Sequence, residues 1–143
     1  MRFYVASGLD NADQVKSLAA LLRLNGWEHT YDWTAHGSVD NETPSRKQEV
    51  CLAETLGVSS ADHVIVLLPG GRGTFTEFGM ALAWDKKITV FAPSLKYLKP
   101  DGQGLVFFEY PNVKIYVGLT QEEMVSVLID RPVALQTNQG GKP

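Results

Sequence analysis

The sequence predicts a single α/β domain built on a parallel β-sheet, and three observations lead to this prediction. Short apolar runs of strand length recur along the chain, the clearest being residues 64–68 (VIVLL). Segments with a helical spacing of apolar residues separate these runs, as in residues 12–24, where Val15, Leu18 and Leu22 share one face. The 143 residues, 44% of them hydrophobic, suffice for one core. Strands that alternate with helices form a parallel sheet that is covered on both faces.

The pattern divides the chain into five strands and four helices. The predicted strands are residues 3–6, 27–33, 63–68, 88–92 and 113–117. The predicted helices are residues 12–24, 45–56, 74–85 and 121–129. Asn25-Gly26 ends the first helix and Thr120 caps the last. Residues 27–33 form the least apolar of the predicted strands and are expected near an edge of the sheet. The pattern fits a flavodoxin- or Rossmann-like three-layer sandwich with a five-stranded parallel sheet in the order 2-1-3-4-5.

Composition limits the classes of function. We expect residues 1–135 to form the one domain and residues 136–143, which are polar and contain glycine, to be a frayed tail. A net charge of −3 argues against a binder of polymeric nucleic acid, because no basic stripe is available to neutralise phosphates. The single cysteine, Cys51, excludes an intrachain disulfide and a cysteine-rich zinc site.

Metal, cofactor and membrane motifs are absent from the sequence. His29, His36 and His63 lack the spacing of metal ligands, and neither GxGxxG nor GxxxxGK[ST] occurs, so we expect no metal and no cofactor. The first residues have the pattern of a short strand rather than of a signal peptide, and no apolar run approaches membrane-spanning length. A cytoplasmic location without membrane partners is therefore the expectation.

The most informative segment is PGGRGTFTEFGMA, residues 69–81, which joins the third predicted strand to the third predicted helix. Its first three glycines, Gly70, Gly71 and Gly73, let backbone N–H groups approach an anionic ligand at the positive end of the helix, where Arg72 can clamp a phosphate. Glu77 is its only carboxylate. The alternative is a plain turn in which Glu77 favours the helix dipole and Arg72 is solvated. Three glycines, an arginine and a threonine exceed what a plain turn needs.

Topology gives independent support for a binding site at this segment. Ligands of such sheets bind beyond the carboxyl ends of the strands, at the switch between strands 1 and 3. This rule brings residues 7–11 together with residues 70–77. The second strand ends nearby, so Trp33 can stack on a base, and His36 can touch a ligand. The candidate substrate-binding residues are Ser7, Gly8, Asn11, Trp33, Gly70, Gly71, Arg72, Gly73 and Thr74.

Glu77 is the first candidate for catalysis. A carboxylate can attack the anomeric carbon of a sugar and form a covalent glycosyl-enzyme, while a second acid protonates the leaving group. Glu54 is the best-placed partner, although a glutamate on a helix surface is often merely solvated. Tyr4 is either an ordinary core tyrosine or the residue whose hydroxyl holds the catalytic carboxylate. Asp62 lies before the third strand, far from the strand's carboxyl end, and is interpreted as structural.

In these features the chain resembles the nucleoside 2-deoxyribosyltransferase superfamily. The shared motifs are FYVA (residues 3–6), Ala61-Asp62 before the third strand, and EFGMA (residues 77–81), in matching order and spacing over residues 1–92. The resemblance implies that Glu77 is the glycosyl nucleophile and Tyr4 its hydroxyl partner. Glu54 stands where the family usually has a catalytic aspartate. The resemblance also implies a homo-oligomer, a dimer or larger, in which a neighbour helps to complete the site.

One departure from the family pattern bears on the reaction. The transferases commonly carry a base-reading aspartate six residues before the nucleophile, where this chain has Gly71. The departure favours the hydrolase branch, which cleaves nucleoside 5′-monophosphates, over base exchange. The pattern PGGxGTxxE also marks phosphoribohydrolases that act on cytokinin nucleotides. The resemblances to the hydrolase branch and to the phosphoribohydrolases predict the same reaction, cleavage of an N-glycosidic bond in a nucleotide or a (deoxy)nucleoside. The alternatives are a transferase that exchanges bases and a non-catalytic nucleotide-binding domain.

Overall fold

The computed structural model describes residues 1–130, so the predicted tail at residues 136–143 lies outside the described part. Its five strands form one all-parallel sheet in the order β2-β1-β3-β4-β5, which confirms the predicted fold class and strand order. The strands are β1 (Arg2–Ser7), β2 (Glu28–His29), β3 (His63–Leu67), β4 (Lys87–Ala92) and β5 (Val113–Val117).

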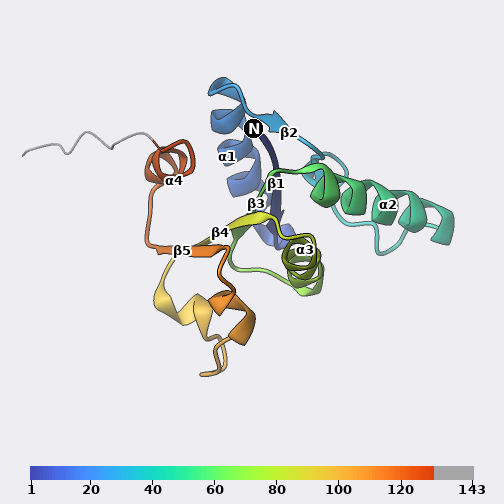
Figure 1. Cartoon of the computed structure of the whole chain (residues 1–143). Coiled ribbons are helices and arrows are strands. Elements are labelled where there is room, and N and C mark those ends of the chain that lie inside the picture. The colour runs from blue at the N-terminus through green and yellow to red at the C-terminus, as the bar shows by residue number, and fades with distance from the viewer. Residues whose placement is uncertain (131–143) are drawn as a thin grey trace, which may run out of the picture.

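Helices cover both faces of this sheet (Figure 1). The α-helices are α1 (Ala12–Leu24), α2 (Pro44–Ser60), α3 (Arg72–Ala83) and α4 (Gln121–Leu128). Four short 3₁₀ turns are η1 (Leu9–Asn11), η2 (Trp33–Ala35), η3 (Leu95–Leu98) and η4 (Val106–Glu109). Helix α1 packs with α4, and α2 packs with α3. None of the helices within residues 1–130 combines the length and the apolar character needed to cross a membrane.

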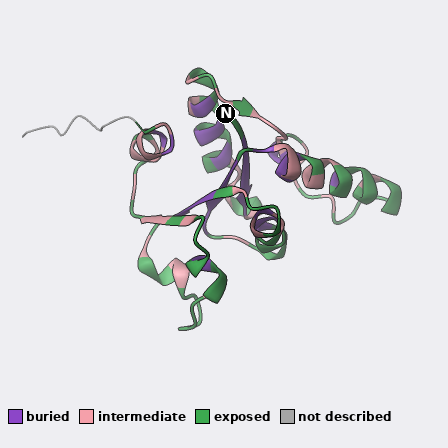
Figure 2. Ribbon diagram, in the orientation of Figure 1, coloured by how far each residue is buried: buried purple, intermediate pink, exposed green. Residues whose placement is uncertain are grey.

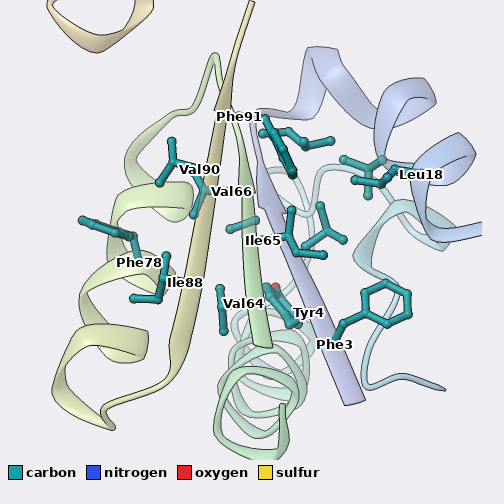
Figure 3. Close-up of a cluster of buried hydrophobic side chains, with 14 of the residues drawn as sticks. Phe3, Tyr4, Leu18, Val64, Ile65, Val66, Phe78, Ile88, Val90 and Phe91 are labelled. Atoms are coloured by element: carbon teal, nitrogen blue, oxygen red, sulfur yellow. The ribbon is translucent and has the colours of Figure 1, made fainter. Parts of the chain in front are cut away.

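The core consists of the central strands and the helix faces that pack on them. Strands β1, β3 and β4 are buried along nearly their whole length, whereas much of α2 is exposed (Figure 2). Figure 3 shows side chains of these strands packed between Leu18 of α1 and Phe78 of α3. Burial of such side chains from water is the main favourable contribution to the stability of the fold.

Register places the loops of the predicted site side by side. Ser7 at the end of β1 pairs with Leu67 at the end of β3, and Leu67 pairs with Phe91 of β4. The loops that follow β1 and β3 therefore leave the sheet at the same edge. The N–H of Gly8 donates to the carbonyl of Pro69 at 3.1 Å, which fastens the two loops directly to one another.

The bounds of β2 and α2 differ most from the sequence prediction. The strand predicted at residues 27–33 spans only Glu28–His29, because Asp32 accepts a hydrogen bond from the backbone N–H of Thr34 at 3.0 Å and starts η2 instead. The helix predicted at residues 45–56 continues as α2 to Ser60. Its last turns bury Gly57 and Val58 against the sheet, and this tertiary packing extends the helix beyond its local apolar pattern.

Candidate active site

A cleft of about 340 Å³ opens at the carboxyl ends of β1 and β3. Four segments form its walls: the loop after β1, the loop before α2, the middle of α2 and the first turns of α3. The lining residues are Ser7, Gly8, Leu9, His36, Gly37, Ser38, Val39, Asp40, Val50, Glu54, Gly71, Arg72, Gly73, Thr74 and Glu77. The structure thus brings together both predicted carboxyl groups and most of the predicted binding residues.

Glu77 lies on the inner face of α3 and has only 8% of its surface exposed. Tyr4, fully buried in β1, donates its hydroxyl hydrogen bond to Glu77 Oε2. Burial raises the pKa of Glu77 to about 8, the hydrogen bond from Tyr4 opposes this rise, and the negative charge of Glu54 adds to it. Burial, the charge of Glu77 and the hydrogen bond to Glu77 raise the pKa of Tyr4 above its ordinary value, so the phenol keeps its proton.

Glu54 gives the cleft a second carboxyl group. It lies on α2 and is partly buried. Burial raises the pKa of Glu54, while the positive charge of His36 lowers it. Two acids therefore share one small cleft, and burial makes each of them hold its proton at a higher pH than it would in water. A pair of carboxyl groups of this kind can supply a nucleophile and a proton donor.

The start of α3 forms the other end of the cleft. Thr74 Oγ1 accepts a hydrogen bond from the N–H of Gly71 at 3.1 Å, which fixes the first turn. The N–H groups of the next residues, Arg72 and Gly73, have no acceptor within the helix because they belong to its first turn. Both residues are exposed on the cleft wall. This end offers backbone donors, the positive end of a helix dipole and a guanidinium group, which together suit an anion.

Three predicted binding residues do not line the cleft. Asn11 borders a neighbouring cavity, and its Nδ2 donates to Ser7 Oγ at 3.0 Å. Gly70 serves the turn, since a Cβ placed there would lie 2.6 Å from Cγ2 of Thr74. Trp33 belongs to the core, with 5% of its surface exposed and its indole N–H donating to the carbonyl of Val5 at 2.8 Å. This burial corrects the expectation that Trp33 stacks on a base.

The sequence prediction missed part of the cleft wall. Residues 38–40, Leu9 and Val50 also line it. The only sign of these residues in the sequence was the polar loop around His36. In the structure, His36 Nδ1 lies 2.8 Å from the carbonyl of Gly37 and donates a hydrogen bond to it. His36 Nε2 is enclosed and has no hydrogen-bond partner within residues 1–130. Over the same residues, no group of three His, Cys, Asp or Glu side chains is arranged to hold a metal ion.

Comparison with known proteins gives a match at the level of the fold. No protein-family model and no curated protein sequence matches the chain. The structure is similar to that of the CMP N-glycosidase BcmB of Clostridium botulinum, with a TM-score of 0.58 and 19% sequence identity. The match covers 90% of this chain and 99% of that one, so the two share their architecture from nearly one end to the other.

The hydrogen bond between Tyr4 and Glu77 leads to a prediction about ionisation. Tyr4→Phe keeps the buried ring and removes the hydroxyl that stabilises the charged carboxylate. We expect the pKa of Glu77 to rise above its wild-type value of about 8. Titration of the ¹³C-labelled glutamate carboxyl carbons by NMR, with Glu77→Gln to identify the resonance, measures the change. Tyr97→Phe, in η3 and outside the cleft lining, should leave it unaltered. A Glu77 pKa that falls or stays constant in Tyr4→Phe contradicts the role given to Tyr4.

Proposed function

We propose that this protein is an N-glycosidase that releases the base from a nucleoside 5′-monophosphate or a (deoxy)nucleoside through a covalent intermediate on Glu77. The observation that carries the proposal is the buried carboxyl of Glu77, which is held by Tyr4 and shares a cleft with Glu54. The resemblance in motifs to nucleoside 2-deoxyribosyltransferases supports it. So does the fold shared with a protein named as a CMP N-glycosidase.

The reaction begins with attack of the ionised Glu77 carboxylate on C1′ of the sugar. The electron pair of the C1′–N bond passes to the base, and Glu54 supplies the proton that the departing base needs. A glycosyl ester on Glu77 results. Water then attacks C1′, gives a proton to the Glu54 carboxylate and releases Glu77. Tyr4 holds the nucleophile in place through its hydroxyl group. Glu54 begins the cycle protonated and ends it protonated, so the protons balance.

We propose that the part of the cleft at the start of α3, which we call the anion end, holds the 5′-phosphate of the substrate. Arg72 and Gly73, whose N–H groups have no acceptor within the helix, lie at the start of α3 and line the same cleft as Glu77. A phosphate dianion is favoured there by N–H donors, by the helix dipole and by the guanidinium. A nucleoside without the phosphate makes none of these interactions.

Water is the proposed acceptor of the glycosyl group. Exchange of one base for another requires a side chain that holds the incoming base, and Gly71 has none at the position where the transferases commonly have a carboxylate. Space near Gly71 is open, since a Cβ built there would meet no atom within 4 Å. This open space favours hydrolysis over base exchange.

We propose further that two or more copies of the chain associate through α2. Leu52 and Leu56, which lie one turn apart on this helix, have 63% and 65% of their surfaces exposed. Contiguous exposed apolar surface of this kind is a mark of protein–protein interfaces. A homo-oligomer is also what the family resemblance implies. Since Glu54 is on the same helix, a neighbour that packs on α2 would lie close to the cleft.

Glu77→Gln should abolish base release, because the amide cannot attack C1′. Loss of a covalent nucleophile costs on the order of 10⁴-fold or more in kcat. The assay is chromatographic detection of free base from common nucleosides and their monophosphates. Glu122→Gln, at an exposed position of α4, is the matched control and should keep wild-type turnover. More than about a tenth of wild-type turnover in Glu77→Gln would show that the nucleophile lies elsewhere.

The same variant tests the ionisation of the nucleophile. The folded-state pKa of Glu77, about 8, lies above the ordinary glutamate value of 4.5, so ionisation of this group destabilises the fold as the pH rises between these values. Glu77→Gln should therefore be at least as stable as wild type at pH 8 in thermal unfolding, which separates loss of activity from loss of fold. In the wild type, kcat/KM should be bell-shaped in pH, because it rises as Glu77 ionises and falls as Glu54 loses the proton that it gives to the base.

Arg72→Ala should remove most of a preference for phosphorylated substrates. A charge-assisted pair of this kind contributes roughly 1.5–3 kcal/mol, about ten- to a hundredfold. The measurement is the ratio of kcat/KM for a monophosphate to that for its nucleoside, in wild type and variant. Arg23→Ala on α1, exposed and outside the cleft lining, should leave the ratio unchanged. A wild-type ratio near one refutes the phosphate site while leaving the reaction itself intact.

Replacement of both Leu52 and Leu56 by Glu should convert an oligomer into a monomer, because carboxylates cannot be buried unpaired in an apolar interface. Sedimentation velocity over a range of protein concentrations measures the mass. Leu24→Glu provides the control, since Leu24 is 83% exposed on α1. If the wild type sediments as a monomer at all concentrations, association through α2 is excluded.

A further inference from the structure

Gly57 lies where α2 comes closest to β1 and to the segment after β2. A Cβ built on Gly57 would be 2.7 Å from Cβ of Tyr31 and 3.0 and 3.1 Å from Cδ2 and Cε2 of Tyr4. Real Cβ atoms essentially never lie within 3.0 Å of another heavy atom, so the contact with Tyr31 is excluded, and the two contacts with Tyr4 are tighter than nine in ten real Cβ contacts. Gly57 itself is buried. No side chain fits at this position unless Tyr4, Tyr31 or the helix moves.

Hydrogen bonds fasten the helix at this point. The hydroxyl of Thr30 lies 2.7 Å from the carbonyl of Gly57 and donates to it. The backbone N–H of Thr30 donates to the carbonyl of Phe3 in β1 at 2.9 Å. Thr30 therefore ties the end of α2 to the strand that carries Tyr4. Movement of the helix away from β1 would break the bond to Gly57, so the space at Gly57 cannot be enlarged freely.

The tyrosine ring that touches Gly57 is the one whose hydroxyl reaches Glu77. Tyr4 has 0% of its surface exposed, so its ring is enclosed on every side and any displacement is transmitted to the hydroxyl. Glu54 lies three residues before Gly57 on the same helix and lines the cleft. One position on α2 thus lies against the partner of the nucleophile and within one turn of the second acid.

We propose that Gly57 is a positioning residue: the absence of a side chain there sets where the Tyr4 hydroxyl and the Glu54 carboxyl stand relative to Glu77. Its consequence for catalysis rests on the proposed function, whereas its effect on the geometry of Tyr4 and Glu77 does not. A methyl group at residue 57 pushes the Tyr4 ring away from α2 and weakens the hydrogen bond to Glu77. Displacements of about 1 Å among catalytic groups can cost on the order of 100-fold in rate.

The experiment compares Gly57→Ala with Gly79→Ala. Gly79 is an exposed helical glycine of α3 with no atom within 4 Å of a Cβ built on it, so a methyl group there meets open space. Gly57→Ala should raise the pKa of Glu77, measured by carboxyl ¹³C NMR without substrate, and should lower kcat/KM by at least about tenfold. In a Tyr4→Phe background, Gly57→Ala should change this pKa little, because the hydrogen bond is already absent. Gly79→Ala should change neither quantity.

A merely structural role would lower the melting temperature of Gly57→Ala without moving the pKa of Glu77. A Glu77 pKa that is unchanged or lowered in Gly57→Ala therefore overturns the proposal. If Gly57→Ala does not fold, Tyr31→Gly removes the nearest contact atom and makes room for the methyl group. The pKa of Glu77 in Tyr31→Gly/Gly57→Ala is then compared with that in Tyr31→Gly alone, with the same outcomes. If the wild type releases no base from any substrate, the proposed function fails, but the NMR comparison still decides the role of Gly57.

Discussion

The buried carboxyl group of Glu77 is the constraint around which the cleft is arranged. Removal of a carboxylate from water is costly, and it is tolerated only where hydrogen bonds or nearby charges compensate. Here Tyr4 provides the hydrogen bond from β1, the strand next to the one that leads into α3. The Tyr4 side chain is fully buried, and α2 approaches its ring closely at Gly57. One arrangement around Glu77 therefore includes the glycine-rich turn before α3, Tyr4 in β1 and Gly57 on α2.

The sequence predicts the features that depend on local pattern. Apolar runs of strand length locate β1, β3 and β4, and a helical spacing of apolar residues gives α1 its bounds. The connection from β3 to α3 is recognisable because glycines, an arginine and a carboxylate rarely occur together by chance. The rule that ligands bind at the carboxyl ends of parallel strands then joins residues that are more than sixty positions apart, such as Ser7 and Arg72.

Other features depend on tertiary contacts that leave no local signal. Strand β2 pairs with β1 over two polar residues only, Glu28 and His29, so no apolar alternation separates it from the turn that follows. From sequence alone, an aromatic residue near the end of a strand can either stack on a ligand or belong to the core. Trp33 belongs to the core, where its indole N–H donates to the carbonyl of Val5. The loop at residues 37–40 shows no periodic pattern of apolar residues that would predict its place. It lines the cleft because it leads into α2, which begins at Pro44. The close approach at Gly57 is visible only in three dimensions.

The anion end of the cleft has a consequence for how the ligand preference of this chain can change in evolution. Its hydrogen-bond donors belong largely to the main chain at the start of α3, and no substitution other than proline deletes a main-chain N–H. A point mutation can therefore remove the guanidinium but cannot dismantle the donor array. Gly71 and Gly73 have open space around them, so side chains can be added there without repacking the core. Ligand preference at this end would therefore change by the addition of side chains beside main-chain donors that stay in place. It would revert when the added side chain is lost.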